Sequence, residues 1–531
     1  MRRMLLVWAA AALGLLPSIS DSVRESGVAG QTPTVVGPLS GDFELFDRVP
    51  ASALLAVSVS NLDERWAEIR GTPALANLQD ALLSRRGVAA DLIPLLAGRR
   101  SVFFLAPADR WPFAVPVAIL QPPDVRKARA ILGSMPDVAY LEGDGVLWVG
   151  PALSVDLLAQ LAREQGPRFP EAVPLTEIAN RLPAGGLVRG CVNSGALLRM
   201  LRGPAIESCP YLLRGPAAGL AAELSAVRYA AFRRDFVDGE FRSDGLVAYD
   251  RNRLPAEVAG ILDPGARPVA IPSAASLLRM PDGSDQVPFM VMAFRPESRA
   301  WMPWIRYVAA SDPHGPLRNI AFWLEEFEHR YGRHLERDLF EVFGDRAWLL
   351  ATRSENQNSM QVVLVMELSA RTAIEGTLQD LFSWAGEQLW LSSFGILSTR
   401  SWEEHQPGRL MSGLTLRTPL SSLKGPAFEV DDRYLVVALQ PSGLATGRAW
   451  IESLKSEPPQ EAGGSSHATI LVEPSQLASL IKTFRPAASS ESDRLLWDAV
   501  LGLMADSKTL QVDMKYEPDA ITFQGRLRVG D

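Results

Sequence analysis

Histidines beside carboxylates are the residues of this chain best suited to metal or acid–base chemistry. The sequence has five His, and two of them, His329 and His334, lie among Glu325, Glu328 and Glu336. Two imidazoles and a carboxylate are a common zinc ligand set. A helix turns about 100° per residue, so a spacing of five residues, about 500°, points the two rings in different directions. The segment is therefore interpreted as a solvated, charged helix face, and we expect no metal site there.

Cys191 and Cys209 are the two cysteines of the chain. An exported location would permit a disulfide between them. The alternative is two independent buried thiols, because free Cys packs as a small apolar residue. Spacing alone does not show whether the geometry of a disulfide can close, so both interpretations stay open.

The local patterns that carry enzyme chemistry are missing from the sequence. It contains no G-x-S-x-G, no Gly-Lys pair of a phosphate-binding loop, no H-E-x-x-H and no C-x-x-C. Gly143 and Gly145 lack the third glycine of a dinucleotide-binding loop. We therefore predict no catalytic, cofactor-binding or metal-binding residue, and no cofactor. The alternative is an exported hydrolase whose catalytic residues are dispersed along the chain.

Tryptophan is abundant, with thirteen residues, and is common both in cores and at contact surfaces. Trp301 and Trp304, three apart, and Trp384, within an apolar helical pattern, are expected in the core. Trp402 stands beside Glu403 and is the aromatic that we expect to be exposed and available for a contact.

The N-terminus has the pattern of a secretory signal. Residues 1–20 combine Arg2 and Arg3 with a short apolar run and a small-x-small site ending at Ser20. Residues 21–41, rich in Ser, Gly, Thr and Pro, are interpreted as a flexible tether. We expect an exported protein of the periplasm or cell exterior. The alternative is an uncleaved N-terminal membrane anchor; no later run is long enough to span a membrane.

Length and charge narrow the class of protein. A chain of 531 residues is too long to fold around a single hydrophobic core, so we expect several domains. A formal net charge of -8 argues against a nucleic-acid partner, because such proteins usually carry a basic face. The leading hypothesis is a non-catalytic scaffold or binding module, and a protein or a cell-envelope component is the expected class of partner.

Two segments of the chain repeat one pattern. Residues 91–132 and 338–378 both open with Asp-Leu, followed by a glycine (Gly98, Gly344) and an arginine (Arg100, Arg346). Each then predicts two strands and a helix, and later hairpins also recur in the same order. The sequence therefore predicts an α+β fold made of two tandem, diverged copies of an antiparallel-sheet-plus-helices unit. The copies span residues 42–250 and 287–531, with a Pro-rich joint at 251–286 and an insertion at 386–427 that adds a strand near 410–417.

The opening of the first copy carries a family resemblance. Its first folded element is predicted as a strand at 53–60, and Asn61 and Glu64 are then expected to form a capping box on a helix. The opening also has Val49-Pro50, the strand at 54–59, Leu62, Trp66, Thr72-Pro73, Leu75 and the segment 91–98. These residues resemble a family of exported bacterial proteins catalogued only as a domain of unknown function. The resemblance implies export and a repeated α+β fold, and it implies no catalytic residues.

Overall fold

The computed structural model describes residues 41–84, 93–98, 100–107, 114–135, 137–202, 221, 224–261, 288–296, 300–311, 316–353, 360–392, 398–406, 409–417, 422–456, 467–483 and 491–529. The predicted signal at 1–20, residues 21–40 of the predicted tether and Cys209 lie outside the described residues. Of the predicted joint at 251–286, the part up to residue 261 is described, and it contains two short helices.

The first part of the chain alternates strands with short helices. Its elements are η1 (Gly41–Arg48), β1 (Leu55–Ser60), α2 (Leu62–Gly71), α3 (Pro73–Ser84), α4 (Ile93–Ala97), β2 (Arg100–Pro107), β3 (Ala114–Gln121), α5 (Val125–Gly133), β4 (Val138–Gly143), β5 (Val146–Pro151), η3 (Ala152–Ser154), α6 (Val155–Arg163), α7 (Phe169–Ala172), α8 (Leu175–Arg181), β6 (Val188–Val192), α9 (Ser194–Arg202), β7 (Val227–Val237), β8 (Glu240–Tyr249), η5 (Arg251–Arg253) and α11 (Ala256–Ile261).

The second part has longer helices. Its elements are β9 (Met290–Phe294), α13 (Trp301–Ser311), α14 (Pro316–Tyr331), the π-helical turn η7 (Glu336–Phe340), β10 (Phe343–Arg353), β11 (Met360–Leu368), α15 (Thr372–Ser392), β12 (Ser398–Gln406), β13 (Arg409–Arg417), β14 (Ser422–Val430), β15 (Tyr434–Ala438), α16 (Gly443–Ser456), β16 (Ala468–Val472), α17 (Pro474–Thr483), α18 (Glu491–Ala505), β17 (Ser507–Glu517) and β18 (Ala520–Val529). Helices and antiparallel strands together give an α+β fold, as predicted. None of the described helices has the length and apolar character needed to cross a membrane.

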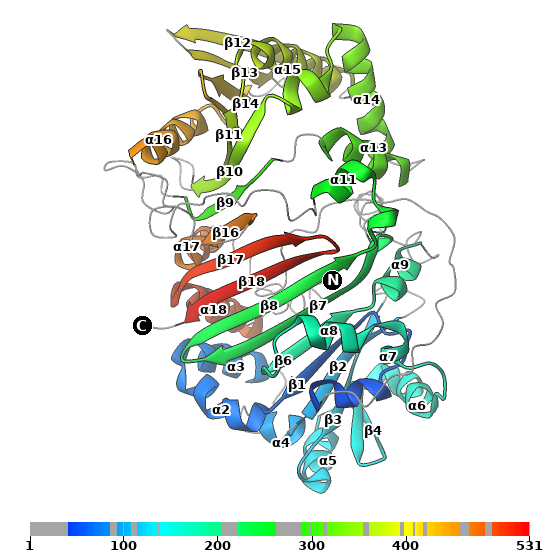
Figure 1. Ribbon diagram of the computed structural model, residues 1–531. Helices are drawn as coiled ribbons and strands as arrows, with labels where there is room; N and C mark the ends of the chain where they lie inside the picture. Colours follow the sequence, from blue (N-terminus) through cyan, green and yellow to red (C-terminus); the bar gives the residue numbers. More distant parts are fainter. Residues whose placement is uncertain are drawn as a thin grey trace.

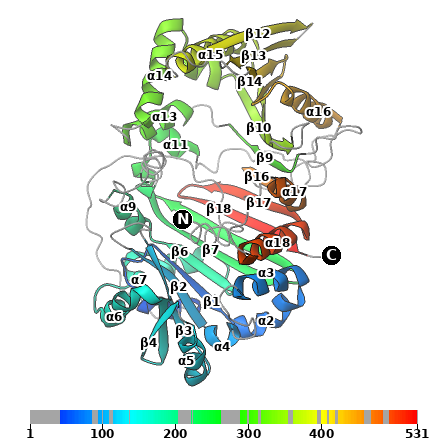
Figure 2. The same cartoon turned by 180° about the vertical axis from the view of Figure 1, so that it is seen from behind.

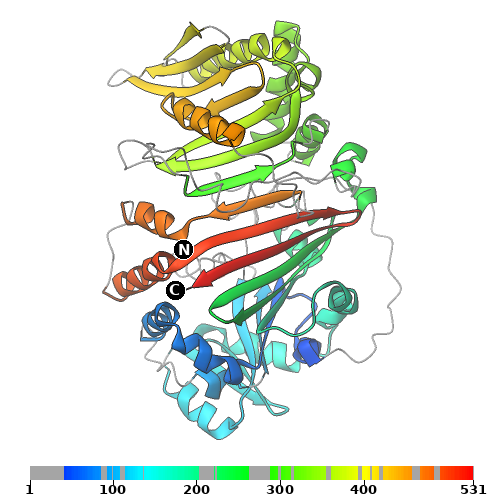
Figure 3. The ribbon, with the colours of Figure 1, turned by 60° about the vertical axis from the view of Figure 1, so that its left-hand side comes forward.

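All eighteen strands join in one antiparallel sheet that runs through the length of the molecule (Figure 3). The pairings place the strands in the order β4-β5-β3-β2-β1-β6-β7-β8-β18-β17-β16-β9-β10-β11-β15-β14-β13-β12. The two parts of the chain meet where β8 pairs with β18, over nine residue pairs. That junction lies near the middle of the sheet.

Helices cover the two faces of the sheet unevenly. One face packs against η1, α6, α7 and α8 at one end and against α16 at the other. The opposite face carries α4 and α5, then α3 and α18, and finally α14 and α15. In Figure 1, which looks onto the first face, α8 lies near one end of β7 and β8, where Tyr229 and Leu246 are buried with it, and no described helix is drawn across β18 and β17. Figure 2 shows α3 and α18 across the other side of the same region.

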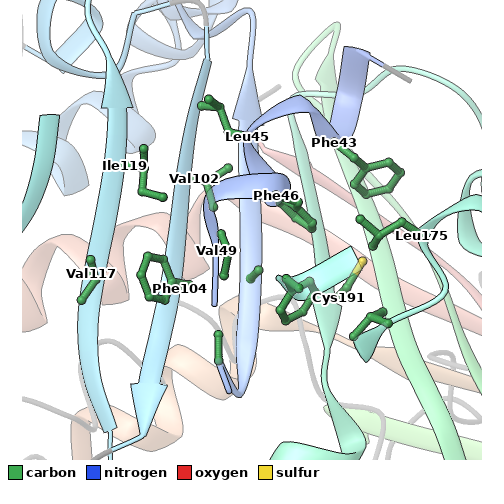
Figure 4. Close-up of a cluster of buried hydrophobic side chains, with 14 of the residues drawn as sticks. Phe43, Leu45, Phe46, Val49, Val102, Phe104, Val117, Ile119, Leu175 and Cys191 are labelled. Carbon is green, nitrogen blue, oxygen red and sulfur yellow. The ribbon is translucent and has the colours of Figure 1, made fainter. Parts of the chain in front are cut away.

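The N-terminal 3-10 helix η1 is part of the core. Phe43 and Phe46 are buried and pack edge-to-face, with ring centroids 5.3 Å apart, and Phe46 also meets Phe169 at 5.6 Å. Figure 4 shows Phe46 between the sheet residues Val102 and Phe104 on one side and Cys191 on the other, with Phe43 on the Cys191 side of it. The prediction that the first folded element is the strand at 53–60 is therefore wrong, since η1 precedes it.

The repeated segments fold into the predicted elements. Residues 93–133 form helix, strand, strand and helix, and residues 336–392 form the same succession. Val102, Phe104, Val363 and Val365 are all buried, because alternate strand residues share one face. In α5, Ala128 and Leu132 are buried against the sheet.

Two local predictions differ from the structure. Gly98 leaves α4 with φ 61°, and a side chain there would collide with the Gln121 carbonyl at 2.2 Å, but Gly344 lies inside β10 without a positive φ. It therefore does not occupy a matching turn. Asn61 precedes α2 in a left-handed conformation, φ 55°, and its side chain makes no capping hydrogen bond. A capping box needs an extended N-cap residue, so that prediction is also wrong.

The predicted insertion at 386–427 lies at one end of the sheet. It contains the expected strand, β13, and also β12, which was not predicted. These strands extend the sheet beyond β14, at its outer end (Figure 1). Adding strands there leaves the pairings of the inner strands intact.

Candidate functional site

The candidate site is the stretch of sheet at the centre of the molecule that no described helix covers. Directly opposite residues in neighbouring strands point to the same face. One such row runs from Arg233 through Asp244 and Gln524 to Asp513, and the next runs from Asp235 through Arg242 and Arg526 to Gln511. We call these eight side chains the central polar face.

An arginine-centred network organises the first-part side of this face. Arg233 donates to Asp244 Oδ2 at 3.0 Å and to Asp235 Oδ2 at 3.3 Å. Its Nε donates to the carbonyl of Gly185 at 2.9 Å. Gly186 has φ 111°, and a Cβ there would stand 2.9 Å from the Arg233 Nε. Glycine at 186 therefore leaves room for the guanidinium, and both carboxylates are held in place by one cation.

On the second-part side of the central polar face, neutral hydrogen-bond donors hold the Asp513 carboxylate in place. Asp513 accepts from the Thr469 hydroxyl at 2.6 Å and from the Gln511 amide at 2.7 Å. Across the junction, Arg242 stands directly opposite Arg526, and both are exposed. Two like charges placed opposite each other are unfavourable. Glu240, which accepts from Arg242 Nε at 2.6 Å, compensates for one of them.

A clamp at the edge of the face joins the two parts of the chain. Arg181 of α8 donates to both carboxyl oxygens of Asp519, at 3.0 and 3.2 Å, and to Glu517 at 2.8 Å. Burial opposes the charge of Arg181, but these carboxylates outweigh burial and raise its pKa. One turn earlier, Glu177 accepts from the Tyr229 hydroxyl at 2.8 Å. Burial and that hydrogen bond raise the pKa of Tyr229, so the phenol stays protonated and acts as a donor.

Three described histidines, His329, His334 and His467, lie apart from one another and bind no shared group. His329 and His334 are both exposed, and the nearby carboxylates bind backbone instead: Glu328 accepts from the Leu335 amide at 2.8 Å, and Asp338 accepts from the His334 amide at 2.9 Å. His467 is buried, and its Nδ1 accepts from the Tyr516 amide at 3.1 Å. Among the described residues, no cluster of three or more His, Cys, Asp and Glu is placed to hold a metal ion.

The remaining predicted site residues are placed as follows. Cys191 is a free, buried thiol, and burial raises its pKa. Its predicted partner Cys209 lies outside the described residues. Trp402 is half-buried, because its indole lies over Gly413, where a Cβ would approach it to 2.7 Å. Its role as a contact residue stays a prediction. Trp384 is buried as expected, whereas Trp301, expected in the core, is 39% exposed and stacks on Phe340.

A small hollow separates η1 from strands β1 and β2. It is lined by Glu44, Ser58 and Arg100, among others, and its volume of about 10 Å³ holds about one water molecule. Glu44 and Arg100 form an ion pair at its mouth. A substrate-sized ligand needs a volume of several hundred Å³, so this hollow is not a substrate pocket.

None of the residues of the central polar face was predicted as a site residue. Sequence offered one signal, the alternation of charged residues along the two long hairpins, but it does not show which face is uncovered. No family model, no curated protein and no solved structure matches this chain.

Proposed function

We propose that this protein is a non-catalytic scaffold or binding module, and that the central polar face is its docking surface. The observation that carries the proposal is a face that no described helix covers: both ends of the same side of the sheet are packed under helices, while the centre presents ordered charges. A protein–protein contact surface is expected to hold such charges in fixed positions, because pre-ordered side chains lose little entropy on binding.

The chemistry of the face indicates the class of partner. Arg233 pairs with both Asp235 and Asp244. Arg242, which also pairs with Glu240, and Arg526 are exposed and face each other. A carboxylate or phosphate placed between two guanidinium groups would relieve their repulsion. The partner is therefore a protein or cell-envelope component that presents an anionic group.

We further propose that the chain consists of two tandem, diverged copies of one unit. The strand order β4-β5-β3-β2-β1-β6-β7-β8 has the counterpart β14-β15-β11-β10-β9-β16-β17-β18, with β12 and β13 added outside β14. The pairing of β8 with β18 also supports it. Four residue pairs lie on each side of Asp244↔Gln524, as a local twofold axis between two like hairpins requires.

Export completes the proposal. The pattern of residues 1–20 supports secretion to the periplasm or cell exterior, with cleavage near Ser20. Mass spectrometry of the exported protein is expected to find an N-terminus near Asp21. Membrane-bound material that retains Met1 would instead identify an uncleaved anchor.

Site-specific photo-cross-linking in the native host tests the docking surface. A photo-reactive amino acid at Gln524, on the central polar face, is expected to give a discrete adduct. The same amino acid at Arg126, exposed on α5 far along the sheet, serves as the matched control and is expected not to give it. The adduct should disappear when Arg242→Glu and Arg526→Glu are added. Adducts that are identical from both positions, or that persist in the charge-reversed variant, would refute the proposal.

A further inference from the structure

Strand β12 leaves one end of the sheet open. Among the described strands it pairs only with β13, and Figure 1 shows it as the outermost strand at that end. It has nine residues, contains no proline, and keeps one register with β13 over its whole length. An edge strand exposes a row of unpaired N–H and C=O groups, and a long, regular one is a template for another strand. The opposite end strand, β4, has only six residues.

The side chains of β12 leave this template accessible. Trp402, its largest residue, turns inward over Gly413 of β13 and away from the open edge. Helix α15 packs on the other face of the strand, against Leu410 and Phe428 of the neighbouring strands. Both features pack on the faces of the strand, and no described strand pairs with its outer edge.

The charges of β12 match a second copy of the same strand. Arg400 and Glu404 are both exposed, and they stand two residues before and two residues after Trp402. Residues two apart in a strand share a face. If two β12 strands pair antiparallel about Trp402, Arg400 of each copy stands directly opposite Glu404 of the other. Two favourable cross-strand ion pairs then form, one on each side of the axis.

We propose that the protein forms a homodimer by antiparallel pairing of β12 with β12 of a second copy, with Trp402 at the twofold axis. The chain already contains a junction of this kind, since β8 and β18 pair antiparallel about a local axis and place Glu240 opposite Arg528. The dimer would continue one sheet through both copies. This inference is independent of the proposed docking surface, which lies at the centre of the sheet.

Sedimentation equilibrium of the full chain tests the dimer. A contact of one strand pair is smaller than a standard interface, so we expect reversible association with a Kd on the order of micromolar. Arg400→Glu or Glu404→Arg alone places like charges opposite each other and should weaken the dimer about tenfold or more. The double variant Arg400→Glu, Glu404→Arg restores the pairs with exchanged signs and should recover the dimer. Arg417→Glu, an exposed residue of β13, is the matched control and should leave association unchanged.

The outcomes that overturn the inference are distinct. A wild-type chain that remains monomeric up to about 100 μM excludes the dimer, since a micromolar Kd would then be exceeded many times. A dimer that persists in both single variants uses another surface. A double variant that is folded by circular dichroism yet monomeric excludes the register about Trp402.

Discussion

At the scale of single residues, two glutamates of the second part show how the balance of burial and partners sets the sign of a pKa shift. Glu367 accepts from Arg346 at 3.0 and 3.1 Å and from Arg433 at 2.9 Å. Burial opposes its charge, but these hydrogen bonds outweigh burial and lower its pKa. Glu429 has one close partner, Arg448 at 2.7 Å, and burial prevails, so its pKa is raised.

The two glutamates predict opposite dependences of stability on pH. A carboxyl with a lowered pKa in the folded state adds stability above its unfolded pKa, about 4.3, and this stability is lost as pH falls through the folded value. A carboxyl with a raised pKa reduces stability as pH rises through the same region. Glu367→Gln should therefore cost about 1–3 kcal/mol near neutral pH and progressively less toward acid pH. For Glu429→Gln, the free energy of unfolding of the variant should instead rise relative to that of wild type as pH rises.

Urea unfolding of wild type and both variants, from about pH 3 to pH 7, measures these differences across the unfolded pKa of Glu. Each variant serves as the other's control, because both remove one strand glutamate bound to arginine. If the two differences change in the same direction with pH, the assignment of signs is incorrect.

The central polar face also shows why sequence reasoning missed the candidate site. Arg181 and Asp519 bind each other although 338 positions separate them, so no local spacing connects the two residues. Arg233 and Asp244 are only 11 apart, but their contact depends on the register of the β7–β8 hairpin. Whether that face is covered depends on where α8 and α16 end, and neither position can be read from the hairpin. The sequence shows which residues of the central polar face are charged, but it does not show which residues lie next to them in the fold.

At the scale of elements, predictions succeeded where periodicity and turn chemistry agreed. The two strands and the helix predicted within residues 91–132 are β2, β3 and α5. The hairpin of β4 and β5 turns at Asp144 and Gly145, whose φ values of 51° and 75° suit a tight antiparallel turn. Helix η1 was missed because it follows a Gly- and Ser-rich segment and is too short to show a helical period. Its burial comes from contacts with distant residues such as Phe169.

Helix η1 should contribute strongly to stability despite its shortness. Phe46 is fully buried, and Phe46→Ala should lower the free energy of unfolding by about 3–5 kcal/mol, because the cavity can close only partly. Asp47→Ala, at the next and exposed position, should change it by less than about 0.5 kcal/mol. Chemical denaturation of both variants measures this contrast. A Phe46→Ala variant as stable as wild type would mean that η1 is not docked in solution.

At the scale of the whole molecule, the two parts are linked through the β8–β18 strand pair, the Arg181 clamp and the packing of α3 against α18. The β8–β18 junction supplies nine backbone residue pairs, and Arg181 adds ionic contacts from α8 to the β17–β18 turn. The sheet is continuous across the junction, so the strands on each side are stabilised by pairing and packing with the strands on the other side. A substitution that weakens the junction should therefore allow the two parts to unfold separately.

Two glycines in the junction provide a matched test of this link. The Phe523 ring lies over Gly245 of β8, and a Cβ at 245 would meet it at 2.0 Å, whereas a Cβ at Gly525 of β18 has its nearest neighbour at 3.6 Å. Gly245→Ala should displace the ring and cost about 1–3 kcal/mol, while Gly525→Ala should be neutral or stabilise by a few tenths of a kcal/mol, about the gain from a less flexible unfolded chain. Native-state hydrogen exchange should show the first and second parts exchanging together in wild type and Gly525→Ala. In Gly245→Ala the two parts should exchange at different rates, because the pairs that couple them are weakened. Equal losses of stability in both variants would show that the packing of Phe523 over Gly245 does not maintain the junction.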